Sequence, residues 1–159
     1  MSTPDSLLLA ACGDIMLHNR YQALADAGNA AQVFAPLRDG LHDSDLLVGN
    51  LETPLTRHGA PRDDKLCPRG DPAYASVLAE TGFSVLSLAN NHCLDFGARA
   101  LAETRLHLQA AGIAAIGAGA DLSEAATPAI IERRGIRIGL IAACDAATCR
   151  TIASTLPPG

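Results

Sequence analysis

Short apolar runs alternate with longer amphipathic stretches along most of this chain. The apolar runs, which are typical of buried strands, fall at residues 7–12, 45–49, 83–88 and 113–116. The amphipathic stretches, which predict helices, fall at residues 19–27, 31–41, 72–81 and 96–111. Strands that alternate with helices in this way favour an α/β domain built around a layered sheet.

The stretches between and after these elements have different patterns. Residues 123–126 predict a short helix, and residues 129–132 and 136–143 predict a hairpin or an adjacent pair of strands around residues 133–135. Residues 53–72 hold four of the nine prolines together with several charges, which indicates a long loop. Loops of this length in compact domains are more often functional than structural filler.

Two aspartates and two glycines delimit the later helices. Asp71 and Asp95 stand just before them, where a carboxylate accepts hydrogen bonds from free backbone N–H groups. Gly82 and Gly112 follow them, where glycine supplies the left-handed conformation of a helix end. These positions predict that both carboxylates serve as helix caps.

The composition fits a single domain, which we place at residues 1–159. The chain has 159 residues, of which 48% are apolar, and no tryptophan, so Ala, Leu, Ile and Val must form most of the core. The formal net charge is −5 and no basic stripe offsets it. This charge pattern argues against a nucleic-acid partner and against an anionic membrane surface.

Cysteine spacing and the start of the chain bear on localisation. The five cysteines include no C-x-x-C pair, so free thiols in a reducing compartment are expected. Residues 9–12 resemble a lipoprotein cleavage box, but no Lys or Arg precedes them and the apolar stretch is far shorter than the roughly 7–15 residues of a signal sequence. No other stretch is long and apolar enough to cross a membrane. We therefore expect a cytoplasmic protein without a membrane segment.

Polar side chains follow three of the predicted strands at the point where each strand ends. They are Asp14 after the first strand, Asn50 and Glu52 after the second, and Asn90, Asn91, His92 and Asp95 after the third. The carboxyl ends of the strands of an open α/β sheet form the crevice in which ligands bind. Carboxylate, amide and imidazole groups together can hold Mn, Fe or Zn. The sequence therefore predicts a crevice that binds a divalent metal ion.

Each of these clusters also has an ordinary structural interpretation. Asp14 follows Gly13, a pair that is common in turns and caps, and consecutive asparagines favour turns because Asn tolerates left-handed dihedrals. His92 alone is as compatible with a structural histidine as with a ligand. Arg20 is equally compatible with binding an anionic substrate and with a solvated helix position. The coincidence of all three clusters with strand ends favours the functional interpretation.

Three ordered motifs of this chain are distinctive. They read Gly13-Asp14-Ile-Met-Leu-His-Asn-Arg20, Gly49-Asn50-Leu-Glu52-Thr-Pro54 and Ser87-Leu-Ala-Asn-Asn-His92-Cys-Leu-Asp95-Phe-Gly97. They resemble three successive motifs of the CapA family, the poly-γ-glutamate capsule-synthesis proteins, which are related to calcineurin-like metallophosphatases. Residues 111–119 and 135–141 also match the family pattern. The resemblance runs from residue 8 to residue 143 in the family's order and spacing.

The resemblance implies a fold and a ligand set. The implied fold is a partial four-layer αββα sandwich of the metallophosphatase type, with its C-terminal part missing. By position the metal ligands would be Asp14, Asn50, Glu52, Asn91 and His92. They would hold one or two divalent ions (Mn, Fe or Zn) incompletely, because the C-terminal half of family members supplies further histidines. Met16 stands where related metallophosphatases have a histidine ligand, a departure that CapA proteins share.

Three functions are compatible with this resemblance. The first is a metal-dependent hydrolase of phosphoester or amide bonds, in which His92 and Asp14 are catalytic and Arg20 and Asn90 bind substrate. The second is a non-catalytic role in binding an anionic polymer or other components of a capsule-synthesis assembly. The third is an inactive truncated fragment.

The resemblance also implies partners and a location. The expected partners are a small-molecule or anionic polymer substrate, and either the missing C-terminal half or a second copy of the chain. One of these would cover the apolar face that an incomplete sandwich leaves open. The family points to the cell envelope, whereas the start of the chain points to the cytoplasm.

Overall fold

The structure is a computed structural model that describes residues 6–17, 20–41 and 43–145. Its strands are β1 (Leu9–Ile15), β2 (Leu46–Leu51), β3 (Phe83–Ser87), β4 (Ala114–Ile116), β5 (Ala129–Arg133) and β6 (Ile136–Leu140). Its helices are α1 (Arg20–Leu24), the π-helical turn η1 (Ala25–Asn29), α2 (Ala30–Leu41), α3 (Tyr74–Thr81), α4 (Gly97–Ala110) and α5 (Leu122–Ala125). The order of these elements follows the predicted alternation.

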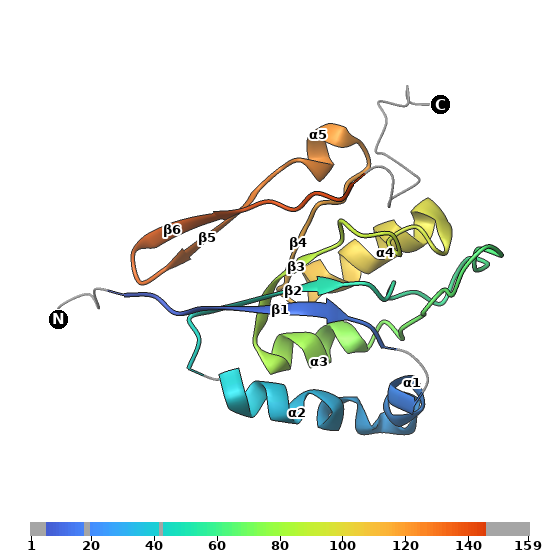
Figure 1. Cartoon of the computed structure of the whole chain (residues 1–159), viewed down its shortest axis with the longest axis horizontal. Coiled ribbons are helices and arrows are strands. Elements are labelled where there is room, and N and C mark those ends of the chain that lie inside the picture. Colours follow the sequence, from blue (N-terminus) through green and yellow to red (C-terminus); the bar gives the residue numbers. More distant parts are fainter. Residues whose placement is uncertain (1–5, 18–19, 42, 146–159) are drawn as a thin grey trace.

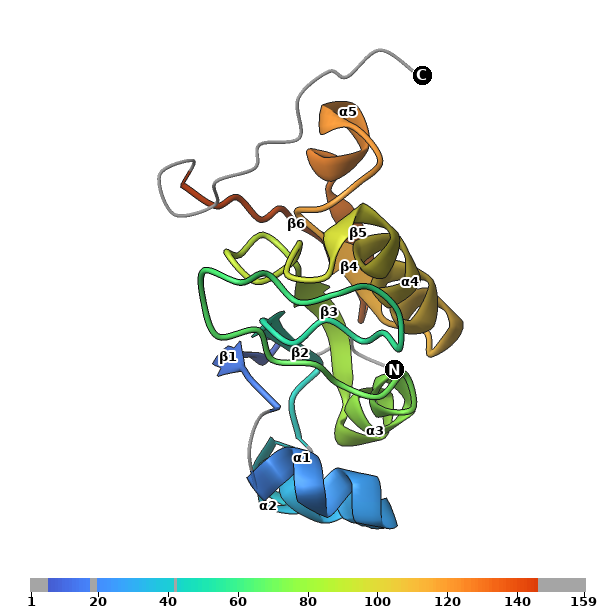
Figure 2. The same ribbon diagram turned by 90° about the vertical axis from the view of Figure 1, so that its right-hand side faces the viewer.

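Four parallel strands form the central sheet in the order β1-β2-β3-β4, and β5 and β6 form a separate antiparallel hairpin. Helices α1, α2 and α3 lie on one side of the sheet and the hairpin lies on the other (Figure 1). In the view turned by a right angle, α1 and α2 again lie below the sheet and the hairpin lies above it (Figure 2). The predicted α/β fold is confirmed, and its layers agree with part of an αββα sandwich.

The central strands are buried on both faces, which explains their continuous apolar sequences. Leu47 and Leu86 belong to a core with α2, α3 and α4, in which Leu78 and Leu108 are fully buried. Successive side chains of a strand point to opposite faces, and Val85 accordingly packs in a second cluster with partly buried residues of the hairpin. The two clusters hold the sheet between the helices and the hairpin.

Strand β1 differs from its prediction in burial and in extent. Within the described part of the chain β1 pairs with β2 alone, which makes it an edge strand. Leu9 is 41% exposed, so the prediction of a buried strand is wrong. The strand continues to Ile15 with an irregular register between Ala11 and Asp14, so Asp14 lies within the strand and not in a loop. Apolar periodicity alone does not distinguish an edge strand from a central one.

The C-terminal ends of the helices follow the predictions except in the first helical region. The predicted Asp71 cap is wrong, because α3 begins at Tyr74 with Ala73 at its N-cap position and no side-chain cap bond. Asp71 Oδ1 instead accepts a hydrogen bond from the Ala73 backbone N–H at 2.9 Å, just before the helix. Helix α3 ends at Gly82, which adopts a left-handed φ of 108°. The helix predicted at 19–27 is interrupted, because α1 ends at Leu24 and Gly28 adopts non-helical dihedrals within η1. Among the described residues, none of the helices has the length and apolarity needed to cross a membrane.

Most of the described cysteines are free thiols, as predicted. The free thiols among the described residues are those of Cys12, Cys67 and Cys93. Cys144 is disulfide-bonded, so the expectation of free thiols is wrong at this position. The spacing rules applied to the sequence concern metal knuckles and disulfide frameworks, and they do not detect a single bridge.

Asp45 ties the hairpin to the start of the sheet. Its carboxylate accepts a hydrogen bond from the Leu8 backbone N–H at 2.9 Å and forms an ion pair with Arg134 in the hairpin turn. Its backbone carbonyl accepts a hydrogen bond from Arg133 Nε at 3.2 Å. The Asp45 side chain is only 12% exposed, whereas that of Arg134 is 45% exposed, so the carboxylate is shielded from water and its partner is not.

Replacing Asp45 by alanine is expected to lower the free energy of unfolding by about 1–3 kcal/mol, because hydrogen bonds to a shielded charged group are lost. Urea unfolding followed by circular dichroism measures this loss. The control is Asp39→Ala, since Asp39 forms an exposed ion pair with Arg38 and such pairs contribute about 0–1 kcal/mol. Equal losses in the two variants would contradict the role of Asp45.

Candidate active site

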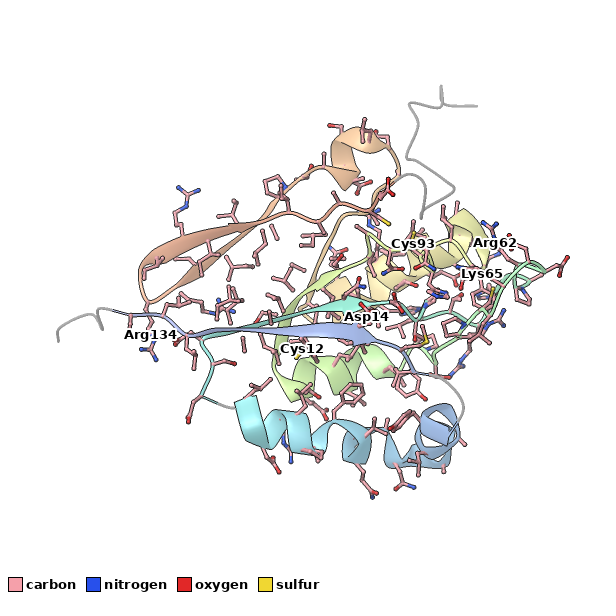
Figure 3. The ribbon with its side chains drawn as sticks, viewed as in Figure 1. Cys12, Asp14, Arg62, Lys65, Cys93 and Arg134 are labelled. Atoms are coloured by element: carbon pink, nitrogen blue, oxygen red, sulfur yellow. The ribbon has the colours of Figure 1, made fainter. Side chains whose placement is uncertain are left out.

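The parallel register of the sheet brings the predicted polar clusters together at one edge. Asp14 lies beside Asn50 across β1 and β2, and Asn50 lies beside Ser87 across β2 and β3. The segment that follows Ser87 carries Asn90, Asn91 and His92. Asp14 and the segment around Cys93 lie toward the same end of the sheet, where the loop that carries Lys65 also lies (Figure 3).

A relay of side-chain amides joins the three strand ends. Asn50 Nδ2 donates to Asp14 Oδ1 at 2.8 Å, and Asn50 Oδ1 accepts from Asn90 Nδ2 at 3.0 Å. Asn90 Nδ2 also donates to the Leu51 carbonyl at 2.9 Å, and Asn90 Oδ1 accepts from the His92 backbone N–H at 3.0 Å. Asn90 is buried, so its amide sets the positions of Asn50 and His92 from within the protein.

The imidazole of His92 forms a pair with the carboxylate of Asp95. His92 Nδ1 lies 2.6 Å from Asp95 Oδ2, and the Asp95 side chain is fully buried. A carboxylate only accepts hydrogen bonds when ionised, so this contact places a proton on Nδ1. The other ring nitrogen, Nε2, is thereby the one left for a ligand or substrate.

Asp95 does not cap the helix that follows it, and the predicted cap is wrong. Helix α4 begins at Gly97 with Phe96 at its N-cap position, and no side chain bonds to that cap. The carboxylate is directed instead to His92 and to Lys65. Pairing with charged groups stabilises the buried Asp95 carboxylate more than a helix cap would, because burying an unpaired carboxylate costs much free energy.

Lys65 is a member of this cluster that the sequence did not indicate. Its ammonium lies 2.6 Å from Asp95 Oδ1, donates to the Asn91 carbonyl and lies 3.3 Å from His92 Nδ1. A lysine in a charged loop is usually solvated, so residue type gave no signal. The length of the 53–72 loop was the one available indication that it serves the site.

The carboxylate of Glu52 lies in the field of this cluster. Burial and the nearby charge of Asp14 raise the pKa of Glu52, whereas His92 and Lys65 act in the opposite direction. A cation beside Glu52 would favour its ionised form and offset the repulsion from the charge of Asp14. Asp14 and Glu52 therefore have the donor chemistry for part of a divalent-cation site.

The described residues do not by themselves form a complete site of this kind. Within residues 6–17, 20–41 and 43–145, no three side chains of His, Cys, Asp or Glu are arranged to hold a metal ion. Asn91 is exposed, and its carbonyl accepts the Lys65 hydrogen bond. Arg20 begins α1, and its side chain lies outside the described part of the chain. The predicted roles in metal binding, catalysis and substrate binding stay predictions for all of these residues, which are Asp14, Arg20, Asn50, Glu52, Asn90, Asn91 and His92.

The motifs that form this edge of the sheet lie within a region that matches a known protein family. The family model described as bacterial capsule synthesis protein PGA_cap matches residues 8–157. The chain belongs to this family. The predicted membership of the CapA family of capsule-synthesis proteins is thereby confirmed.

Individual known proteins are similar to the chain over 63–98% of its length. It is 26% identical to the capsule biosynthesis protein CapA of Bacillus anthracis over an alignment of 159 positions that covers 98% of this chain and 39% of that protein. It is 42% identical over 105 residues to a probable polyglutamine synthesis accessory protein of Mycobacterium tuberculosis (strain ATCC 25618 / H37Rv), covering 63% of this chain and 27% of the relative. It is 28% identical over 123 residues to the PGA biosynthesis protein CapA of Bacillus subtilis (strain 168), covering 76% of this chain and 32% of the relative. The chain thus spans 27–39% of the length of these relatives.

In this PGA_cap family member, the loop that carries Lys65 is held against α4 through Glu103. Thr56 Oγ1 donates to the Glu103 carboxylate, His58 Nδ1 lies 2.9 Å from it, and Arg99 Nε donates to it at 3.1 Å. These contacts, with the Thr56 hydroxyl first, lower the pKa of Glu103 from 4.5 to about 2. The ionised carboxylate therefore stabilises the contact between loop and helix.

The contribution of Glu103 to stability is expected to depend on pH. It is complete above the unfolded-state pKa of 4.5 and is lost as the pH falls through the folded-state pKa of about 2. Urea midpoints of the wild type and of Glu103→Gln measure it, with a clear difference at neutral pH that shrinks near the folded-state pKa. A difference of the same size at both pH values would contradict this assignment.

Proposed function

We propose that this edge of the sheet is part of a metal-dependent hydrolase site of the phosphoesterase type, which acts in the synthesis of a capsule or poly-γ-glutamate polymer. The observation that carries the proposal is the His92–Asp95 pair next to the Asp14–Glu52 carboxylates. The first offers proton transfer and the second offers cation binding. The relatives named for capsule and PGA biosynthesis support the polymer context.

His92 is suited to move a proton at Nε2. The Asp95 carboxylate holds Nδ1 at 2.6 Å, and Asn90 holds the His92 backbone N–H at 3.0 Å, so ring and backbone are both oriented. When the ring is protonated, Asp95 stabilises the imidazolium and the Nε2 proton can pass to the leaving oxygen of a phosphoester or to the leaving nitrogen of an amide. Asp95 therefore acts through His92, as a positioning residue.

Asp14 and Glu52 would hold the metal ion, with the Asn50 and Asn91 amide oxygens as further donors. A bound Mn, Fe or Zn ion supplies an activated water and stabilises charge on the transition state. Asn50 is fixed for such a role, because its Nδ2 bonds to Asp14 and its Oδ1 bonds to Asn90. Since the relatives are much longer, we propose that residues from the rest of a family member complete the ligand set.

Hydrolysis of p-nitrophenyl phosphate and bis(p-nitrophenyl) phosphate, with and without Mn²⁺, tests this function. The wild type is expected to hydrolyse one of them only with Mn²⁺, and Asp14→Asn is expected to remove that activity. Asp39→Asn serves as the control, because Asp39 is exposed and remote in sequence from the site motifs. Activity that survives Asp14→Asn would refute the site. Polymer binding without any hydrolysis would favour the non-catalytic role.

A further inference from the structure

The ammonium of Lys65 occupies a small pocket of donor atoms on the Asp95 side of His92. Asp95 Oδ1 lies 2.6 Å from Nζ, His92 Nδ1 lies 3.3 Å from it, and the Asn91 carbonyl accepts a hydrogen bond from it. Carboxylate and carbonyl oxygens are also donor types of divalent metal sites in proteins, whereas His92 Nδ1 carries its proton toward Asp95 and is not such a donor. A positive charge at this point is therefore held by two oxygen donors of the kind that a bound divalent ion uses.

The position of this ammonium is fixed by the way its loop docks on the start of α4. The Arg62 backbone N–H donates to the Asp95 carbonyl at 3.1 Å. Arg69 lies with its guanidinium carbon 4.0 Å from the centre of the Phe96 ring and donates to the Gly59 carbonyl at 2.6 Å. Gly59 has a φ of 82°, and a Cβ there would lie 2.3 Å from the Phe96 carbonyl oxygen, so the close approach requires glycine.

The buried Asp95 carboxylate needs a cation next to it, so the identity of that cation matters. The Asp95 side chain is fully buried and that of Lys65 is 24% exposed, so the carboxylate depends on the ammonium for neutralisation. A second cation among the same donors would be repelled by the ammonium, because the two charges would be close together and the buried position screens them weakly. Lysine and a metal ion are therefore alternatives at this point.

We propose that the Lys65 ammonium is the resident cation of this pocket, tethered there by the loop, and that it excludes a divalent ion from the Asp95 side of His92. The consequence for the hydrolase is that a divalent ion is confined to the Asp14–Glu52 side. That consequence rests on the proposed function. The occupation of the Asp95 pocket by lysine does not depend on it.

The test counts Mn²⁺ bound per chain by electron paramagnetic resonance in the wild type and in Lys65→Ala. Lys65→Ala is expected to gain one Mn²⁺ per chain that the wild type does not bind at the same concentration, and Lys65→Arg is expected to gain none. The matched control is Arg57→Ala, which removes a cation from the same loop, where Arg57 pairs with Asp71 at 2.7 Å. The gained ion is expected to disappear in Lys65→Ala/Asp95→Asn.

Three results would overturn the proposal. They are no gain in Lys65→Ala, an equal gain in Arg57→Ala, and a gain that survives Asp95→Asn. Lys65→Met, which retains the apolar stem of the side chain, replaces Lys65→Ala if the latter fails to fold. Folding of either variant that requires Mn²⁺ supports the exchange of one cation for another. Failure of both to fold even with Mn²⁺ refutes it.

Repeating the count in a Glu52→Gln background separates this proposal from the proposed function. Glu52→Gln is expected to remove the ion of the Asp14–Glu52 side and to leave the gain caused by Lys65→Ala unchanged. A wild type that binds no Mn²⁺ would contradict the proposed hydrolase site, while the gain in Lys65→Ala would still support the tethered cation.

Discussion

Replacing His92 by glutamine is expected to lower Mn²⁺-dependent hydrolysis by about 10²–10⁴-fold, the range of general acid–base catalysis by one side chain. Glutamine is similar in length and still forms hydrogen bonds, but it cannot transfer a proton at the position of Nε2. Initial rates on phenyl phosphate and p-nitrophenyl phosphate measure the effect. The loss should be larger for phenyl phosphate, because phenolate is the poorer leaving group and needs the proton more.

The matched control for this experiment is His58→Gln. His58 also pairs with a carboxylate, Glu103, but it does so where the loop contacts α4 and outside the His92 cluster. We expect its rates to stay close to those of the wild type. A loss in His92→Gln that is the same for both leaving groups would mean that His92 does not protonate the leaving oxygen.

Replacing Asp95 by alanine is expected to lower the free energy of unfolding by about 2–3 kcal/mol. Breaking a fully buried ion pair costs roughly 3–5 kcal/mol. The smaller value applies here because the Lys65 end of the pair is 24% exposed and can gain water. The variant leaves both the ammonium and His92 Nδ1 without their carboxylate.

Urea unfolding measures this loss, with Asp64→Ala as the control. Asp64 pairs with Arg62 on the same loop at 2.9 Å, but both side chains are more exposed, at 34% for Arg62 and 46% for Asp64. We expect the control to lose at most about 1 kcal/mol, as surface pairs do. Similar losses in Asp95→Ala and Asp64→Ala would show that the buried pair has no special role in stability.

The layered fold could be predicted because its signals are local and repeated. Leu47 and Leu86 stand in apolar runs that are buried on both faces, and Gly82 marks a helix end by a conformation that glycine favours. The burial of β1 could not be predicted, because the number of neighbours of a strand is a property of the whole sheet. The same limit applies to Asp14, which an irregular register places inside β1.

The positions of candidate-site residues could be predicted where the parallel register of the strands determines them. They could not be predicted where a long loop determines them. Asp14, Asn50 and Asn90 meet because three neighbouring parallel strands end together, as their positions after apolar runs indicated. Asp95 was assigned to a cap because that role is local, whereas its partner Lys65 comes from a distant loop. A side-chain pair between residues so far apart in the sequence, such as Lys65 and Asp95, leaves no periodic or positional pattern in the sequence.

The most direct test of the central claim, that Asp14 and Glu52 form part of a divalent-cation site, is thermal unfolding with and without Mn²⁺. Burial and, after it, repulsion from Asp14 raise the pKa of Glu52, so Glu52→Gln is expected to have a higher Tm than the wild type in the absence of metal. Mn²⁺ should raise the Tm of the wild type and leave that of Glu52→Gln unchanged. An equal response of both proteins to Mn²⁺, or none in the wild type, would contradict the claim.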